Sequence, residues 1–229
     1  MGLFKYETHA HTAEGSKCSK ISAVELVHIY KRWGYSGICI TDHFLNGNTT
    51  VPEVLPWTER IELFCRGYEK AYAEGEEIGI EVFFGWEYSY KGTDILTYGL
   101  DKEWLLSHPG LLGYSINEYC DLAHNSGGLL VHAHPFREAE YIAMIRLLPR
   151  RVDTVEVINA CRTDFKNERA LEYANNYNLL KLAGSDTHRA QIESLAGIQA
   201  KRKLGDIDDM IKVIKDGQAE VFSEKSMKM

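Results

Sequence analysis

The chain has 229 residues, of which 45% are hydrophobic and 11% aromatic, and its 26 basic and 33 acidic side chains give a formal net charge of −7. This composition supports a sizeable core and argues against intrinsic disorder. The acidic balance and the lack of a basic run argue against binding along an extended nucleic acid, although bound cations could still hold an anionic substrate.

The cysteines and the first residues predict a cytoplasmic protein with no membrane contact. The five cysteines are odd in number, widely spaced and form no C-x-x-C pair: Cys18, Cys39, Cys65, Cys120 and Cys161. Residues 1–7 lack the apolar core of a signal peptide, and no stretch approaches membrane-spanning length. At this length we expect one domain that covers residues 1–229.

The first half of the chain is predicted to alternate between strands and helices. A strand at 3–8 precedes a helix at 22–33, for which Ser22 is a suitable N-cap and Gly34 a suitable end. The elements that follow are a strand, a charged helix beyond a long loop, and two further strands, at 36–41, 57–77, 79–90 and 92–99.

The second half continues the alternation. A helix at 115–126 leads into a strand at 129–133. Further strand–helix units are predicted at 138–148, 152–158, 166–177 and 179–184, before a last strand, helix and strand at 196–201, 206–216 and 219–222. Alternating strands and helices are typical of a parallel sheet, and this many units favours a closed barrel over an open sheet.

Histidines and carboxylates gather where the predicted strands end. They form four short clusters and one single residue: Glu7-Thr8-His9-Ala10-His11, Thr41-Asp42-His43, Glu87, His132-Ala133-His134-Pro135 and Ser185-Asp186-Thr187-His188. Side chains two positions apart on a strand point to the same face, so both members of a histidine pair can bind one ion. Because the strands of a barrel converge at one end, this pattern indicates a multinuclear metal site there.

Together these motifs closely resemble those of the polymerase and histidinol phosphatase (PHP) family, over about residues 5–190. The resemblance implies an α/β fold, a distorted TIM-like (β/α)7 barrel, with the metal site at the C-terminal ends of the strands. It implies up to three divalent ions of zinc, manganese or iron, and the number of candidate ligands favours two or three. The ligands that it implies are His9, His11, His43, Glu87, His134, Asp186 and His188.

Two positions depart from the family pattern. In the loop after the first motif, where many relatives carry an aspartate or a histidine, this chain offers Glu14, Ser16 and Cys18, and we favour Glu14 as a ligand. Asp94 stands where relatives often carry a histidine, and we expect its carboxylate to bind an ion as well. An additional carboxylate would tilt the site toward manganese or iron.

The resemblance implies hydrolysis of a phosphate ester, which a hydroxide activated by the metal ions would carry out. Asp42, His132 and His188 are the candidates for the proton donor to the leaving oxygen, and the sequence does not choose among them. Arg137, three residues after His134, could contact the substrate phosphate with paired donors. We expect a small phosphorylated substrate, such as a nucleotide, a sugar phosphate or an amino-alcohol phosphate.

Two other interpretations stay open at this point. An amidohydrolase also places a histidine pair after its first barrel strand, but an amidohydrolase site does not need the motifs at 41–43 and 186–188. In addition, no bridging lysine is evident on a middle strand. A non-catalytic, metal-binding PHP module is the other interpretation. The near-complete set of ligands argues against it, because a decayed site should have lost some of them.

Overall fold

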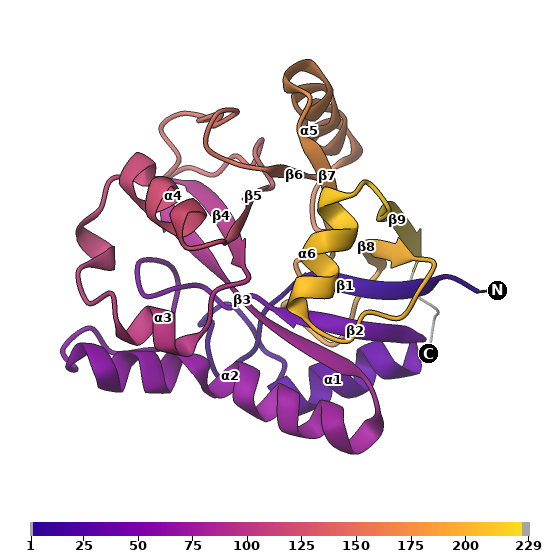
Figure 1. The fold of residues 1–229 in the computed structure, drawn as a ribbon, viewed down its shortest axis with the longest axis horizontal. Helices are drawn as coiled ribbons and strands as arrows, with labels where there is room; N and C mark the ends of the chain where they lie inside the picture. The colour runs from indigo at the N-terminus through magenta and orange to yellow at the C-terminus, as the bar shows by residue number, and fades with distance from the viewer. Residues whose placement is uncertain (1, 226–229) are drawn as a thin grey trace.

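A mixed sheet of nine strands forms the centre of the chain, which the computed structural model describes over residues 2–225 (Figure 1). The strands are β1 Phe4–Ala10, β2 Tyr35–Ile40, β3 Glu81–Tyr90, β4 Thr93–Tyr98, β5 Leu129–Ala133, β6 Thr154–Asn159, β7 Leu180–Gly184, β8 Ser194–Ala200 and β9 Glu220–Lys225. The helices are α1 Ala23–Arg32, α2 Trp57–Ile78, α3 Lys102–Leu106, α4 Ile116–Asn125, α5 Asp164–Tyr177 and α6 Ile207–Lys215, with a 3-10 turn, η1, at Leu111–Gly113. Within the sheet the order is β7-β6-β5-β4-β3-β2-β1-β8-β9.

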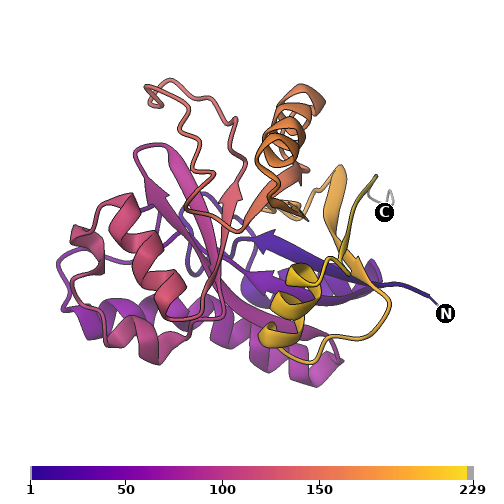
Figure 2. The ribbon, with the colours of Figure 1, turned by 45° about the horizontal axis from the view of Figure 1, so that its top comes forward.

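The sheet curls until the end of β7 meets β1, which nearly closes a barrel (Figures 1 and 2). The backbone N–H of His11 donates to the carbonyl of Thr187 at 3.0 Å. The N–H of Asp186 donates to the carbonyl of His9 at 2.8 Å. Gly184 permits this approach, since a Cβ there would lie only 2.5 Å from the Cβ of His9. The α/β barrel predicted from the sequence is therefore confirmed.

The sheet is mixed, whereas the alternation of elements predicted a parallel one. β4 runs antiparallel to both β3 and β5, and β8 runs antiparallel to both β1 and β9. Lys91 and Gly92 join β3 to β4 with positive φ angles of 49° and 84°. Such a short connection can form only a hairpin, because parallel neighbours need a crossover of a dozen or more residues.

Residues 138–148, predicted as a strand–helix unit, form neither a strand nor a helix. The apolar side chains of this arm do not face a core: Tyr141, Met144 and Ile145 are all exposed. Burial of an apolar face supplies most of the stability of a helix in a protein, and most apolar side chains of this segment stay exposed. The arm extends beyond the end of β5, above the barrel in Figure 2.

Helices α1 and α2 lie beside each other along the outside of β2 and β3 (Figure 1). Ser22 caps α1 as predicted, because its side chain accepts a hydrogen bond from the N–H of Glu25. The face of α1 that meets the sheet carries Leu26, Val27 and Tyr30, all fully buried. No helix of residues 2–225 combines the length and the apolar character needed to cross a bilayer.

Helix α6 packs against the beginnings of the barrel strands. Its Met210 and Ile214 belong to the same buried cluster as Tyr6, early in β1, and Leu129, at the start of β5. The N–H of Leu204, just before the helix, donates to the hydroxyl of Tyr6 at 2.7 Å. The apolar core therefore fills one end of the barrel, and the histidine-bearing strand ends lie at the other.

Candidate metal centre

The ends of β1, β2, β3, β5 and β7 bring imidazoles and carboxylates from distant parts of the chain into one cluster. Three groups of side chains have ligand atoms within 4.8 Å of one another: His11, His43 and His188; His9, Glu87 and His134; and His9, His11 and Asp186. All the ligands that the family resemblance implied lie in these groups. The structure therefore brings together residues that the sequence separates by as many as 179 positions (188 − 9).

Two of these residues are held in a strained backbone conformation. His134 has a φ angle of 28° and Asp186 one of 55°, in the left-handed region that residues other than glycine rarely adopt. Such conformations cost on the order of 1–3 kcal/mol each and persist where the surroundings impose them. The carboxylate of Glu156 contributes to this at His134, because it accepts the backbone N–H at 2.8 Å.

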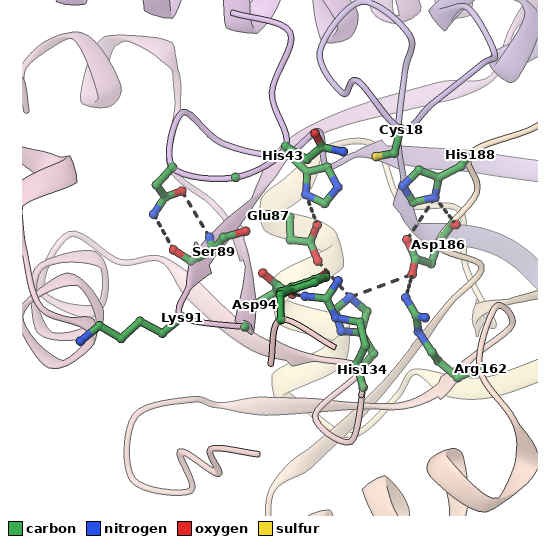
Figure 3. A pocket seen from close by; sticks show the side chains of 16 residues that line it. Cys18, His43, Glu87, Ser89, Lys91, Asp94, His134, Arg162, Asp186 and His188 are labelled. Carbon is green, nitrogen blue, oxygen red and sulfur yellow. Dashed lines mark hydrogen bonds and ion pairs between the residues drawn. The ribbon is translucent and has the colours of Figure 1, made fainter. Parts of the chain in front are cut away.

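Glu87 lies at the centre of the cluster and is 1% exposed. Its Oε1 is 3.0 Å from the Nε2 of His134, and its Oε2 is 2.6 Å from the Nδ1 of His43 (Figure 3). Burial opposes ionisation of the carboxyl, but the positive charge of His43 and the hydrogen bond from His134 outweigh it and hold the pKa of Glu87 well below its usual range. The two oxygens therefore face two different groups of imidazoles, as a bridging carboxylate would.

The contact between Glu87 and His43 has the distance but not the geometry of a hydrogen bond. The Oε2 of Glu87 and the Nδ1 of His43 are both buried and both lack a hydrogen-bond partner among the residues described. Crowded, unsatisfied donor atoms of this kind suit a cation, which would coordinate both lone pairs. Imidazole nitrogen and carboxylate oxygen are donors that zinc, manganese and iron accept. The residues present thus fit divalent metal ions.

Glu156 of β6 orients His9 from behind. Its Oε1 is 2.8 Å from the Nδ1 of His9, which leaves the Nε2 of that ring 3.1 Å from the Nε2 of His11. Burial lowers the pKa of His9, but Glu156 and Asp186 outweigh it and raise the pKa to about 10, so the carboxylates here call for a positive charge. A carboxylate behind a histidine fixes the ring and its tautomer in many metal sites. The sequence analysis missed Glu156, although a fully buried glutamate within an apolar strand is a signal that could have found it.

Asp94 and Arg137, predicted as a ligand and as a phosphate contact, bind each other. The Nη2 of Arg137 donates to the Oδ2 of Asp94 at 2.6 Å. Asp94 is 2% exposed, and burial together with the nearby Glu87 raises its pKa. The Nε of Arg137 is buried and lacks a partner among the residues described. The ion pair therefore holds the arginine on the wall of the site and uses only one of its five N–H donors.

The structure does not bring Glu14 or Asp42 to the cluster. The carboxylate of Glu14 accepts the N–H of Ala23 at 2.9 Å, at the beginning of α1, and pairs with Lys70. Asp42 is buried beneath the loop that follows β1, where it accepts hydrogen bonds from the backbone and side chain of Thr12. Burial raises the pKa of Asp42 to about 6. Both carboxylates therefore hold backbone in place instead of facing an ion or a substrate.

His132 also lies away from the cluster, contrary to the prediction that it shares a face with His134. Strand β5 ends at Ala133, and the positive φ angle of His134 breaks the alternation on which that prediction depended. The ring of His132 is buried and packs edge-on against Tyr173, with 5.7 Å between the ring centroids. Burial lowers its pKa to about 3, so the ring is neutral.

A cavity of about 530 Å³ opens over the cluster (Figure 3). Three basic side chains of the acidic chain reach its wall: Lys91, Arg137 and Arg162. Arg162, which the sequence analysis missed, donates from Nη2 to the Oδ2 of Asp186 at 3.0 Å, and its buried Nε has no partner among the residues described. Tyr141, 73% exposed, also lines the cavity. An anionic group of a ligand would therefore meet several cations here.

Cys18 and His188 lie together on another part of the wall (Figure 3). The Nδ1 of His188 is 2.7 Å from the carbonyl of Asp186, which leaves Nε2 as the atom available for an ion or a substrate. Burial raises the pKa of the Cys18 thiol, but His188 and His43 outweigh it and lower the pKa to about 6. Among the candidates in the loop after the first motif, Cys18 and not Glu14 is the one that reaches the cavity.

A sequence model of the PHP domain matches residues 7–222 of the chain. No protein of curated function matches the sequence. Among solved structures, a two-domain protein from Bacteroides vulgatus, which contains a predicted PHP-like metal-dependent phosphoesterase, is similar with a TM-score of 0.69 and 13% identity. That likeness covers 96% of this chain but only 65% of the Bacteroides protein.

Two other solved structures are similar over most of their length. A predicted metal-dependent phosphoesterase from Bifidobacterium adolescentis has a TM-score of 0.59 and 16% identity, over 92% of this chain and 95% of its own. An amidohydrolase from Chromobacterium violaceum, with bound sulfate and no metal, has a TM-score of 0.54 and 13% identity, over 81% of this chain and 88% of its own. At such identities the likeness extends to the fold alone.

Proposed function

Since the chain belongs to the PHP domain family, we propose that it is a metal-dependent phosphoesterase that hydrolyses the phosphate ester of a small molecule. The observation that carries the proposal is the position of Glu87, whose two oxygens face separate groups of histidines beneath a cavity lined by cations. The residues that would hold the ions are His9, His11, His43, Glu87, His134, Asp186 and His188. When bound, zinc, manganese or iron lowers the pKa of water and offsets the charge of a phosphate.

The side chains of the cavity wall would bind the substrate phosphate and supply the proton for the leaving oxygen. Arg137 and Arg162 both line the cavity, and we assign the N–H donors of their guanidinium groups to the oxygens of the substrate phosphate. Their ion pairs with Asp94 and Asp186 fix both guanidinium groups before a substrate arrives, which lowers the entropy lost on binding. Of the predicted proton donors, only His188 lines the cavity, and its one available nitrogen, Nε2, would either hold an ion or donate a proton to the leaving oxygen, not both.

The size and charge of the cavity support a small phosphorylated substrate. A volume of about 530 Å³ accommodates a compact phosphorylated molecule such as a nucleotide, a sugar phosphate or an amino-alcohol phosphate. The cavity carries cations on a chain whose net charge is −7, which favours an anionic ligand at this one place. An amidohydrolase is the second candidate, because the Chromobacterium amidohydrolase shares the fold.

The test is a panel of phosphomonoesters, phosphodiesters and N-acyl amides, each assayed with zinc, manganese and iron(II). We expect hydrolysis of phosphate esters that a chelator abolishes and the metal restores. The Glu87→Gln variant, purified in parallel, controls for contaminating phosphatases. Hydrolysis of amides without phosphate esters would replace the proposal with the amidohydrolase. Tight metal binding with no turnover on any class would leave a non-catalytic metal-binding module.

A further inference from the structure

Two of the ligand groups compete for the same imidazole. The Nδ1 of His11 is 3.1 Å from the hydroxyl of Ser16, which leaves only Nε2 for an ion. Yet His11 belongs both to the group with His43 and His188 and to the group with His9 and Asp186. One imidazole nitrogen binds one ion at a time, so the two groups cannot both be complete.

Distances indicate which group takes His11. Its Nε2 is 3.1 Å from the Nε2 of His9 and 3.4 Å from the Oδ1 of Asp186, so these three converge closely. His43 and His188 then remain as a pair, with their ring centroids 6.1 Å apart. Two histidines are one ligand short of the three protein ligands that catalytic zinc sites usually have.

The thiol of Cys18 lies where the missing ligand is needed. Its sulfur points between the rings of His43 and His188 on the cavity wall (Figure 3). The other candidates in this loop are engaged elsewhere, since Glu14 pairs with Lys70 and Ser16 donates to Asp42 at 2.7 Å.

A second feature of the same place also calls for an ion. The Oε2 of Glu87, which is 1% exposed and has no hydrogen-bond partner among the residues described, faces His43 at 2.6 Å. A buried carboxylate oxygen without a partner costs free energy unless a cation or a donor satisfies it. His43 thus lies between this carboxylate oxygen and the thiol of Cys18 (Figure 3).

We propose that Cys18 is a thiolate ligand of a metal ion held by His43 and His188, separate from the ion that His9, His11 and Asp186 would bind. The proposal deepens the proposed function and rests on its metal dependence. Cys18 coordinates as the thiolate, and the thiol proton passes to solvent. Because thiolate is a soft ligand that suits zinc, whereas manganese prefers oxygen, this position should select zinc even where the position that includes Asp186 accepts manganese.

Cobalt(II) tests the proposal because its bond to sulfur has a charge-transfer absorption in the near ultraviolet that bonds to nitrogen and oxygen lack. The full chain is stripped with a chelator and titrated with cobalt(II) without oxygen. We expect the wild type to develop the sulfur band and Cys18→Ser to lose it together with about one equivalent of bound cobalt. Cys161→Ser is the matched control, since Cys161 is exposed and its sulfur is 3.4 Å from the carbonyl of Asp186, and it should keep the band.

The outcomes separate this proposal from the proposed function. Cobalt absorption without a sulfur band in the wild type, or an unchanged band in Cys18→Ser, overturns the assignment of Cys18 and leaves the metal-dependent function standing. A wild type that binds no cobalt overturns both.

A measurement on the wild type covers the case in which Cys18→Ser does not fold. Zinc should slow alkylation of Cys18 by iodoacetamide at least tenfold and leave the rate at Cys161 unchanged. Equal rates at Cys18 with and without zinc would overturn the assignment. In a competition between zinc and manganese, Cys18→Asp should lose at least tenfold of the preference for zinc at one site, and a preference equal to the wild type would also count against the thiolate.

Discussion

The carboxylate of Glu87 contacts imidazoles that come from three other segments of the chain, and it is buried where a charge is costly unless it is compensated. Its two oxygens face different histidine groups, a position from which one carboxylate could hold more than one ion. The nearest other glutamate on the same strand, Glu81, pairs with Lys203 at the far end of β3.

We expect Glu87→Gln to lose at least one equivalent of bound metal and more than tenfold in hydrolysis, because the amide keeps the shape but not the charge that the ions need. Metal content is measured by elemental analysis of protein purified without chelator, and the fold by circular dichroism. Glu81→Gln, on the same strand, should match the wild type in both. Full metal and full activity in Glu87→Gln would show that the carboxylate does not bridge ions.

Arg137 carries a prediction that separates substrate binding from metal binding. A bidentate contact to a phosphate is worth roughly 1.5–3 kcal/mol, so Arg137→Ala should lower kcat/KM by about tenfold to a hundredfold with the metal content unchanged. Arg137→Lys should recover only part of the loss, because an ammonium keeps the charge but not the fork.

The control for Arg137 is Arg146→Ala. Arg146 lies on the same arm and donates to the carbonyl of Lys91 at 2.6 Å, but it does not line the cavity. Steady-state kinetics on one good phosphomonoester compares the variants. A wild-type kcat/KM in Arg137→Ala would mean that the arginine serves only to pair Asp94.

At the scale of secondary structure, β5 shows how a buried histidine affects stability. The folded state holds His132 neutral with a pKa of about 3, against 6.5 in the unfolded chain. Below pH 6.5 the unfolded chain therefore takes up the proton first, and the stability that the neutral ring contributes is lost progressively as the pH falls toward 3.

We expect His132→Leu to flatten this dependence. Between pH 6.5 and pH 5 the single group accounts for about 2 kcal/mol of lost stability, from ~1.4 kcal/mol per pH unit. Urea unfolding of metal-free protein at the two pH values measures the loss in the wild type and in the variant. If both lose the same amount, His132 is not the neutral, buried group described above.

Most of the helices and strands could be predicted from the sequence, because they depend on local signals. Ser22 caps α1 as its position predicted, and Ser115 forms a complete capping box with Glu118 at the start of α4. The irregular structure of the arm at 138–148 could not be predicted. Its apolar residues resemble a core segment, and only the fold shows that most of them face solvent. The antiparallel run β3–β4–β5 likewise depends on how the strands pair, which local signals do not reveal.

The site residues could be predicted where the prediction depended on spacing along the chain, and could not be predicted where it depended on contacts between distant residues. Histidines and carboxylates at strand ends pointed to the side chains that the structure brings into one cluster, because the strands converge there. Glu156 and Arg162 act through His9 and Asp186, from which they are far apart in sequence, and no spacing rule reveals such pairs. His132 was misplaced because the backbone turns just after β5.

At the scale of the whole molecule, the candidate ligands connect strands on opposite sides of the barrel. His9 and His11 come from β1, Glu87 from β3, His134 follows β5 and Asp186 follows β7. Ions bound there would join these strands, whereas the metal-free state must keep the buried carboxylates close together. Metal should therefore stabilise the folded barrel as a unit.

Zinc or manganese at a hundred times its dissociation constant adds about 2.7 kcal/mol, which corresponds to a rise in Tm of roughly 5–10 °C for a chain of this size. Thermal unfolding of chelator-treated protein, before and after the metal is returned, measures the shift. Glu87→Gln should show a smaller one. An unchanged Tm would mean that the ions bind folded and unfolded chains alike, or not at all.

The contact between β7 and β1 also bears on how the protein is made. Thr8, beside the first ligand pair, donates to the carbonyl of Ala183, 175 positions later. At ~5–20 residues per second, a ribosome needs roughly 10–35 s to cover that distance. Throughout this interval His9 and His11 belong to a nascent chain that lacks Asp186. A site that includes all three is complete only after nearly the whole barrel has been synthesised, and any factor that delivers an ion to it would have to act on an almost finished polypeptide.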